Sequence, residues 1–322
     1  MSIPPEVLAA KEALMRPLLA SRLITGVDFG VRDEENPDPE DIALRVFVAT
    51  GDDIPFEVQA VTANFPFPVM FVQRTFTLTQ VSLPDQSRKR PVLGGVSVFS
   101  SRLAAQAQPT AGTLGAIVVD SLDPTTFYGL SNHHVLCADL GRGQGDEIIQ
   151  PEPPFGSIPG DRVGVLHDWA FPEGEPEGSI DAAIFRLETD SIPEVEEVGP
   201  VFGSVEPKLG MLVSKRGRTT GLTFGVIVST GGDYSLAYPR LPAVGAPPSV
   251  WRTLTNQIQV RADFPQSIVF GESGDSGAVV LDSQSRVVGL YWGGGFTSPG
   301  DPLRFGLVTP AASVEFALPI TF

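Results

Sequence analysis

The sequence predicts a mainly β protein, on the basis of three observations. The 322 residues include 34 Gly and 30 Pro, and helix-rich folds seldom tolerate so much proline because it breaks a helix interior. Short runs such as 27–31 and 44–48 alternate apolar with polar or small residues, which is typical of strands. The 42% hydrophobic content supplies a core of ordinary size, and the length suits one or two domains.

The N-terminal part is expected to form a small α+β domain that extends to about residue 80. Residues 4–23 have apolar side chains at three- and four-residue steps after two prolines, a pattern that predicts a helix. Pro17 is expected to kink or interrupt this helix. Strands are predicted at 27–31, 44–48 and 69–78, with an acidic loop between the first two.

The segment GESGDSGA at 271–278 is suited to presenting one serine as a nucleophile. Glycines flank the Asp-Ser pair and allow tight backbone angles. The N–H groups of Gly274 and Ser276 can then point at one spot, as an oxyanion hole requires. A strand, a polar turn and a second strand are predicted to follow. This excludes an α/β-hydrolase elbow, which needs G-x-S-x-G and an immediate helix.

A nucleophilic serine needs a base, and the base needs an acid that orients it. The chain holds only three histidines, of which His133 and His134 lie together in YGLSNHHVLC and His167 stands apart. Asp181 enters an apolar strand in SIDAAIF, where burial is costly unless a partner such as an imidazole donates hydrogen bonds to it. Three rival aspartates are expected to lie in loops and to be solvated, as charged residues usually are: Asp161, Asp168 and Asp190.

Three motifs in the order histidine, aspartate, serine make the chain resemble a trypsin/chymotrypsin-like serine protease. They are SNHHVL, SIDAAIF and GESGDSGAV. The chain is most similar to the disulfide-free intracellular group of bacteria and plants that includes the narrow-leaf proteases, through TAGTLGAIVVD, GDEIIQP and GRTTGLTFG. The resemblance implies a chymotrypsin-like double six-stranded β-barrel over residues 91–322, with barrels at about 92–190 and 205–320 and the active cleft between them.

The resemblance also implies a role for each residue of the motifs. Ser276 matches the nucleophile, His134 the base and Asp181 the orienting acid, while the backbone N–H groups of Gly274 and Ser276 match the oxyanion hole. His133 stands where the family often has asparagine, and is expected to be a solvent-facing neighbour.

The primary specificity pocket is placed by the same resemblance. Its base would be Phe270, followed by Gly271 and Glu272. Its walls would be Tyr291, Trp292 and Gly293 on one side and Gly306 on the other. The lack of an aspartate at Phe270 argues against a demand for Lys or Arg, although Glu272 could pair with a cation. With Gly293 and Gly306 leaving the entrance open, we expect a medium apolar residue before the scissile bond.

Residues 84–91, PDQSRKRP, are predicted to be a polar linker, so that residues 1–90 comprise the N-terminal domain and the linker. Trypsin relatives suggest an alternative, in which cleavage frees an amino terminus near Val92 that pairs with Asp275. Pro91 blocks most cleavage after Arg90, which favours the solvated linker.

Charge and composition exclude several classes of function. The net charge of −16 argues against nucleic acid and anionic membranes as partners. No apolar run is long enough to span a bilayer, and the first residues lack the pattern of a secretory signal. Cys137 is the only cysteine, so no intrachain disulfide forms. This fits a reducing, cytoplasmic location and a buried, inert thiol.

No metal or cofactor is expected. One cysteine and three histidines lack ligand spacing, and GRGQG at 141–145 precedes a strand where a dinucleotide loop needs a helix. The predicted function is an intracellular serine endopeptidase that cleaves polypeptides through an acyl-enzyme. The alternatives are a catalytically silent or latent protease-fold interaction module, and an esterase with the same chemistry. A homo-oligomer through the N-terminal domain is expected by analogy.

Overall fold

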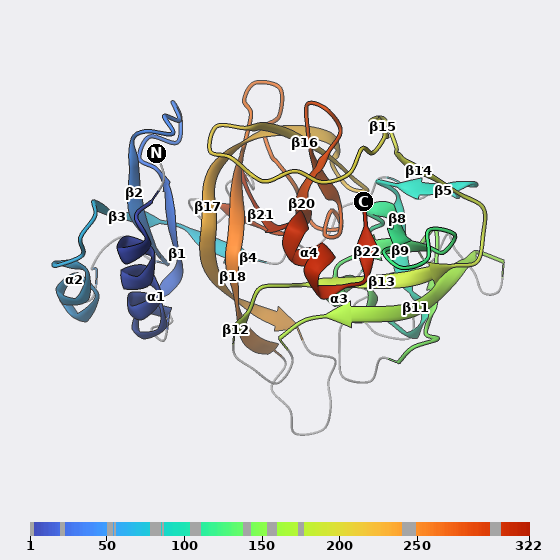
Figure 1. Ribbon diagram of the computed structural model, residues 1–322, viewed down its shortest axis with the longest axis horizontal. Coiled ribbons are helices and arrows are strands. Elements are labelled where there is room, and N and C mark those ends of the chain that lie inside the picture. Colours follow the sequence, from blue (N-terminus) through green and yellow to red (C-terminus); the bar gives the residue numbers. More distant parts are fainter. Residues whose placement is uncertain are drawn as a thin grey trace.

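The protein is mainly β, as predicted, and its strands form two large curved sheets (Figure 1). The computed structural model describes residues 3–19, 23–49, 54, 56–77, 85, 87–103, 111–137, 143–152, 160–172, 177–239, 249–296 and 304–322.

The N-terminal part packs one helix against strands, as expected from its apolar periodicity (Figure 1). The helix α1 continues two residues past Pro17, which was expected to kink or interrupt it. The third predicted strand is divided at Arg74, and Leu78 lies outside the described residues. A second short helix was not predicted. The elements are α1 (Pro5–Leu19), β1 (Ile24–Val31), β2 (Ile42–Val48), α2 (Phe56–Thr62), β3 (Val69–Gln73) and β4 (Thr75–Thr77).

The first barrel is built on an eight-stranded sheet in the order β22-β8-β9-β13-β11-β10-β6-β7. Leu114 joins the segments before β6 and β8, because its carbonyl accepts from the Gly95 N–H at 2.6 Å and its own N–H donates to Val96 O at 2.8 Å. The C-terminal strand β22 belongs to this sheet although it lies at the end of the chain. The strands are β6 (Ser97–Ser100), β7 (Gly112–Thr113), β8 (Ala116–Asp120), β9 (Phe127–Ser131), β10 (Glu147–Ile149), β11 (Arg162–Ala170), β13 (Ala182–Leu187) and β22 (Ile320–Thr321).

Short elements complete this region. A three-stranded sheet lies beside the first barrel, and single-turn helices follow β6 and β9. These elements are β5 (Val92–Gly94), η1 (Ser101–Leu103), α3 (His133–Leu136), β14 (Ser191–Val195) and β15 (Gly199–Pro200).

The second barrel is a closed ring of six strands, β16-β17-β18-β21-β20-β19, in which β19 pairs again with β16. Its interior is filled by apolar side chains that alternate along these strands. The elements of this region are β12 (Glu177–Gly178), β16 (Leu212–Gly217), β17 (Gly221–Pro239), β18 (Ser249–Ala262), β19 (Val279–Asp282), β20 (Val287–Phe296), β21 (Phe305–Pro310) and α4 (Ala311–Ala317).

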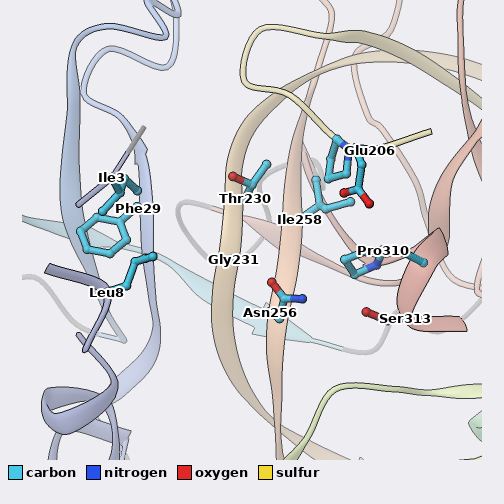
Figure 2. A pocket seen from close by; sticks show the side chains of 12 residues that line it. Ile3, Leu8, Phe29, Glu206, Thr230, Gly231, Asn256, Ile258, Pro310 and Ser313 are labelled. Carbon is cyan, nitrogen blue, oxygen red and sulfur yellow. The ribbon is translucent and has the colours of Figure 1, made fainter. Parts of the chain in front are cut away.

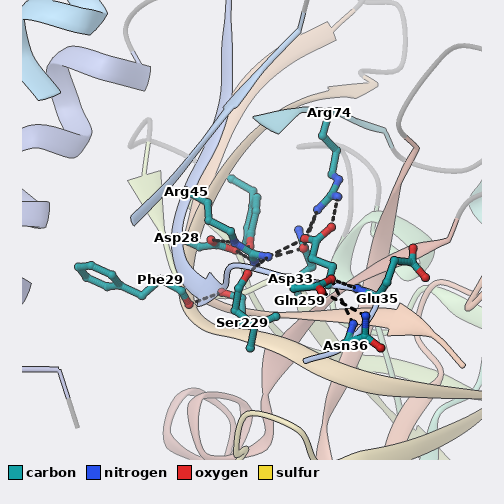
Figure 3. A network of polar contacts seen from close by, with 12 residues as sticks. Asp28, Phe29, Asp33, Glu35, Asn36, Arg45, Arg74, Ser229 and Gln259 are labelled. Carbon is teal, nitrogen blue, oxygen red and sulfur yellow. Dashed lines mark hydrogen bonds and ion pairs between the residues drawn. The ribbon is translucent and has the colours of Figure 1, made fainter. Parts of the chain in front are cut away.

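The N-terminal strands extend the sheet of the second barrel, because β1 pairs antiparallel with β17. A buried polar network holds this junction (Figure 3). Arg45 donates two hydrogen bonds to Asp28, at 2.7 and 2.6 Å, and another to Glu34 at 2.5 Å. Glu34 also pairs with Arg74, which donates to Gln259 of β18 at 2.9 Å. Each charged side chain of this network thus has a partner of opposite charge, as buried ions require.

Candidate functional site

His134 and Asp181 come together at the edge of the first barrel. Nδ1 of His134 lies 2.5 Å from Oδ2 of Asp181, and the His134 backbone N–H donates to Oδ1 at 3.1 Å. His134 lies in the single turn of α3 after β9, and Asp181 immediately precedes β13, the strand paired with β9. Adjacent strands therefore bring together two residues 47 positions apart.

The Asp181 carboxylate is fully buried and ionised. Burial alone would raise the pKa of Asp181, but the charge and hydrogen bond of His134 outweigh it and hold that pKa below its ordinary value. Asn132 steadies the same turn by donating its side-chain N–H to Asp181 O at 2.6 Å. The Tyr238 ring lies edge-on to the His134 ring, with 6.0 Å between centroids. Burial and the nearby Asp181 charge raise the pKa of Tyr238, so its hydroxyl stays neutral.

The turn that carries Ser276 is fixed from behind by the neighbouring Asp275. Its carboxylate accepts from Lys215 Nζ at 2.8 Å, and both side chains are completely buried. It also accepts from the Thr219 N–H at 2.9 Å and the Thr220 hydroxyl at 2.6 Å. Burial would raise the pKa of Asp275, but the Lys215 ammonium and these hydrogen bonds hold it below its ordinary value. Lys215 thus forms the ion pair with Asp275 that the alternative with cleavage near Val92 assigned to a new amino terminus.

Thr113 of the first barrel connects that barrel to the serine turn. Its N–H donates to Ser276 O at 2.8 Å, and its hydroxyl donates to Gly274 O at 2.8 Å. Gly112 lies between Ser276 and the α3 turn, since a Cβ added there would be 2.5 Å from Val135 and 2.8 Å from Ser276 O. The serine turn and the turn that carries His134 therefore both pack against Gly112.

Ser276 Oγ makes its hydrogen bond to Trp292 O at 3.5 Å, and none joins it to the His134 ring among the described residues. Gly274 has φ +92°, an angle that glycine adopts without strain. Neither the Gly274 nor the Ser276 N–H donates to an acceptor in the part of the chain that the structure describes. The turn thus presents a hydroxyl and two N–H groups without strong internal partners.

The residues predicted for the specificity pocket lie in or beside the second barrel, and Phe270 and Gly306 lie next to each other there. Phe270 is fully buried in the barrel core, and a Cβ on Gly306 would lie 2.5 Å from its ring. Gly271 faces Tyr291 in the same way, at 2.6 Å. The rings of Phe270 and Tyr291 therefore fill the space beside Gly306 and Gly271.

The remaining pocket residues belong to the strand and the turn that flank Ser276. The Trp292 side chain is buried and donates to Gln257 Oε1 at 2.8 Å, and it packs with Phe47, Phe76 and Tyr234 at the junction with the N-terminal part rather than with the barrel core. Gly293 pairs with Leu307 of β21. Glu272 is half-buried, and its N–H donates to Asp275 at 3.0 Å. The described contacts thus give the Trp292 side chain a structural role.

Three expectations about neighbouring residues need correction. His133 is 4% exposed rather than solvent-facing, because its ring stacks on Phe171 with 4.4 Å between centroids. Asp161 is buried and pairs with Arg88, and Asp168 lies within strand β11 rather than in a loop. Cys137 is buried, as expected.

The sequence alone assigns no role to four residues that hold the serine turn: Lys215, Thr219, Thr220 and Thr113. Three of them lie in TAGTLGAIVVD and GRTTGLTFG, which carry only the resemblance, and Lys215 lies two residues before the second of these segments. No local pattern signals the role of Lys215, because its carboxylate partner lies 60 positions away.

A cavity of about 440 Å³ lies between the N-terminal part, β17, β18 and the start of α4 (Figure 2). Phe29 and Ile258 form apolar walls, and Glu206 is its one ionisable lining group. It includes none of the predicted site residues. Across the described ranges, no cluster of three or more His, Cys, Asp or Glu side chains is arranged to hold a metal. No helix in those ranges has the length and apolar character to cross a bilayer.

Solved serine proteases are among the structures to which this chain is similar. A glutamic acid-specific serine protease is 17% identical over 71% of this chain and 99% of its own, with a TM-score of 0.47. Protease A of Thermobifida fusca is 18% identical over 71% and 97%, with a TM-score of 0.46. The chymotrypsin of Cellulomonas bogoriensis is 18% identical over 71% and 96%, with a TM-score of 0.45. No protein-family model and no curated protein matches the chain. Function is therefore inferred below from the geometry of the site.

Proposed function

We propose that the protein is a serine peptidase that acts through an acyl-enzyme formed on Ser276. The observation that carries this proposal is the His134–Asp181 pair, 2.5 Å apart and nearly buried, whose turn packs against Gly112 together with the glycine turn that presents Ser276. A buried aspartate bonded to Nδ1 leaves Nε2 of the ring as the basic atom. Rotation about the Cα–Cβ bond of Ser276 moves Oγ away from Trp292 O, and catalytic hydrogen bonds often tighten only when substrate binds.

In the proposed reaction, Ser276 Oγ forms a bond to the carbonyl carbon of the peptide while His134 takes the hydroxyl proton. The resulting oxyanion is stabilised by the unpaired N–H groups of Gly274 and Ser276. The C–N bond then breaks and His134 returns the proton to the leaving amine. Water attacks the ester in the second half, transfers a proton to His134 and releases the carboxylic acid and the serine hydroxyl.

The proposal extends to the preferred residue before the scissile bond and to the location of the protein in the cell. The filled space beside Phe270 supports a shallow apolar pocket, and hence a medium apolar residue before the scissile bond. The single, buried cysteine supports membership of the disulfide-free intracellular group and a cytoplasmic location. Division into residues 1–90 and 91–322, and self-association through the N-terminal domain, are part of the same proposal.

One observation favours a second candidate, a latent or silent protease-fold interaction module. Ser276 Oγ is bonded to Trp292 O and not to the base. A latent site would keep that arrangement when a ligand arrives.

A fluorophosphonate probe distinguishes the two candidates, because it reacts only with an activated serine. Covalent labelling at Ser276, lost in Ser276→Ala and His134→Ala, is expected for the peptidase. Ser273→Ala is the matched control, since this buried serine lies in the same turn and is expected to leave labelling intact. A folded wild-type protein that is not labelled would support the module instead. Comparison of matched peptide and ester substrates then separates a peptidase from an esterase.

A further inference from the structure

The segment that leads to Asp181 of the first barrel lies along strand β18 of the second barrel. Residues Glu177–Gly178 form β12, which pairs parallel with β18 as far as Leu254. Strand β17 covers the opposite edge of β18, so β12 and β21 share the remaining edge. Pairing with β21 begins only at Ile258. Gln257 therefore lies where this edge of β18 passes from the approach to Asp181 to the second barrel's own strand.

The side-chain amide of Gln257 is fully buried and fully hydrogen-bonded. Its Nε2 donates to Ser179 O at 3.0 Å and to Thr255 O at 2.6 Å. Its Oε1 accepts from Trp292 Nε1 at 2.8 Å and from the Thr309 hydroxyl at 2.9 Å. An amide has two donor hydrogens and two acceptor lone pairs, so all four are used. Because an indole N–H only donates and a backbone carbonyl only accepts, these partners fix the orientation of the amide.

The two ends of this amide are bonded to the two halves of the proposed site. The carbonyl of Ser179 lies two residues before Asp181, whose carboxylate orients the proposed base. Trp292 belongs to β20, and its own carbonyl is the group that Ser276 Oγ contacts at 3.5 Å. Gln257 thus joins, through one side chain, the segment that carries the acid and the strand that lies against the proposed nucleophile.

This is the second polar connection between the barrels near the site. The first is Thr113, which bonds to the backbone of the serine turn. A single connection would allow the barrels to pivot about it, and a second one, on the side of Asp181, restricts that motion. Breaking it is costly, because a buried donor or acceptor that loses its partner is not compensated by water.

The distance between His134 and Ser276 depends on how the barrels are placed, because each barrel supplies one of the two residues. Proton transfer requires the imidazole and the hydroxyl to come within hydrogen-bond reach when substrate binds. A misplacement of about 1 Å, caused by a change away from the reacting groups, can lower a rate about 10²-fold.

We propose that Gln257 is a positioning residue, which sets the separation of His134 and Ser276 by holding the Asp181 segment to β20. This rests on the proposed peptidase function. It adds to that function a buried amide that contacts neither the base nor the nucleophile and yet controls the rate at which they react.

The first test measures fluorophosphonate labelling of Gln257→Met, in which an unbranched apolar side chain of similar length replaces the amide. We expect the maximal labelling rate at saturating probe to fall at least about tenfold, because the two reacting residues are no longer held at the right distance. The probe concentration that gives half of this rate should change less than about twofold, since the loss concerns the reaction and not binding. Trp292→Phe breaks the same connection at its other end and should lower the maximal rate at least about threefold. Maximal rates like that of the wild type in both folded variants would overturn the proposal.

Thr309→Val is the matched control for a loss of stability. It removes one hydrogen bond to the same amide but leaves the bonds to Ser179 and Trp292 in place. We expect its free energy of unfolding to fall while its maximal labelling rate stays within about twofold of the wild type. A fall in rate as large as in Gln257→Met would overturn the proposal, because weaker packing alone would then explain both variants.

The low-field 1H NMR signal of the proton between His134 and Asp181 shows where Gln257 acts. We expect this signal to persist unchanged in Gln257→Met, because bonds within the first barrel, from Asn132 and from the His134 N–H, also hold the pair. Loss of the signal would overturn the proposal, since Gln257 would then act on the pair itself and not on the distance between the barrels.

Crystal structures of the wild type and of Gln257→Met separate this inference from the question of catalysis. We expect the distance from His134 Nε2 to Ser276 Oγ to be longer in the variant by about 1 Å, a shift large enough to slow the reaction. An unchanged distance overturns the proposal whether or not the wild type reacts with the probe. A longer distance together with an unlabelled wild type would support the positioning role and count against the peptidase.

Discussion

The two barrels hold the residues of the proposed site in different ways. On the first-barrel side, the side chains of His134 and Asp181 are bonded directly to each other. On the second-barrel side, the bonds are made by the neighbours of Ser276, chiefly Asp275 with Lys215, while Ser276 Oγ retains one long hydrogen bond. The proposed base is thus oriented by its partner, whereas the proposed nucleophile is positioned by a rigid turn and stays free to move.

The comparison predicts that breaking the first-barrel pair has the largest effect on chemistry. In Asp181→Asn the side chain can donate to Nδ1, so the ring presents a proton at Nε2 in place of a lone pair. We expect the rate of fluorophosphonate labelling to fall about 10³–10⁴-fold, as found for chymotrypsin-type triads. Asp168→Asn, on the same barrel but without a contact to His134, is expected to label like the wild type. A fall of less than tenfold would show that Asp181 does not orient the base.

Breaking the second-barrel ion pair should instead act on stability. Lys215→Met leaves the fully buried Asp275 carboxylate without its cation, which we expect to lower the free energy of unfolding by about 3–5 kcal/mol. The double variant Lys215→Met/Asp275→Asn should recover part of this loss, because it removes the charge as well. Denaturant unfolding measures both, with exposed Lys208→Met as the control. A loss of under about 1 kcal/mol would mean that water or another group solvates Asp275.

The sequence predicts the first-barrel side better than the second. His134 and Asp181 lie in short motifs whose residue types, an imidazole and an aspartate entering an apolar strand, already require each other. Lys215 looks like an ordinary strand cation in sequence, and its partner is 60 positions away. Only closure of the six-stranded ring, which pairs β16 with β19, brings the two together.

Sequence also could not show where the N-terminal strands would attach. The composition of a run such as Val69–Gln73 predicts a strand, but it does not predict which strand will pair with it. The split at Arg74 depends on a buried guanidinium that pairs with Glu34, a residue expected to be a solvated part of an acidic loop. The attachment of β4 to β20 was therefore beyond the reach of local patterns.

The pKa directions on both sides give a prediction for acid pH. The pKa values of Asp181 and Asp275 are lower in the folded protein than in the unfolded chain. Their stabilisation is therefore present above the unfolded value of about 3.9 and lost as pH falls through the folded values. We expect the free energy of unfolding to fall below about pH 4, by up to about 1.4 kcal/mol per pH unit for each group.

Denaturant unfolding between pH 6 and pH 3 tests this, and the Lys215→Met/Asp275→Asn variant sharpens it. With the second-barrel carboxylate removed, Asp181 and other carboxyls with a lowered pKa, such as Glu34 and Asp282, still contribute. The acid slope should therefore be smaller than that of the wild type, by up to about 1.4 kcal/mol per pH unit. Equal slopes would show that the pKa of Asp275 is the same in the folded protein and in the unfolded chain.

The smallest expected effect concerns the junction between the N-terminal strands and the second barrel. It tests whether the buried charges there stabilise the fold without acting on the proposed site. The Tyr234 hydroxyl donates to Asp28 at 2.6 Å within the network of Figure 3, where both residues are fully buried. Tyr234→Phe removes one hydrogen bond to a charged group and should lower the free energy of unfolding by about 1.5–3 kcal/mol. Tyr128→Phe, whose hydroxyl donates to the half-buried Asp120 at 3.0 Å, should cost less. The labelling rate of Ser276 should not change in either variant, because Asp28 contacts neither the base nor the serine turn. A labelling defect in folded Tyr234→Phe would instead show that the junction sets the position of β20, and with it the carbonyl of Trp292 that Ser276 contacts.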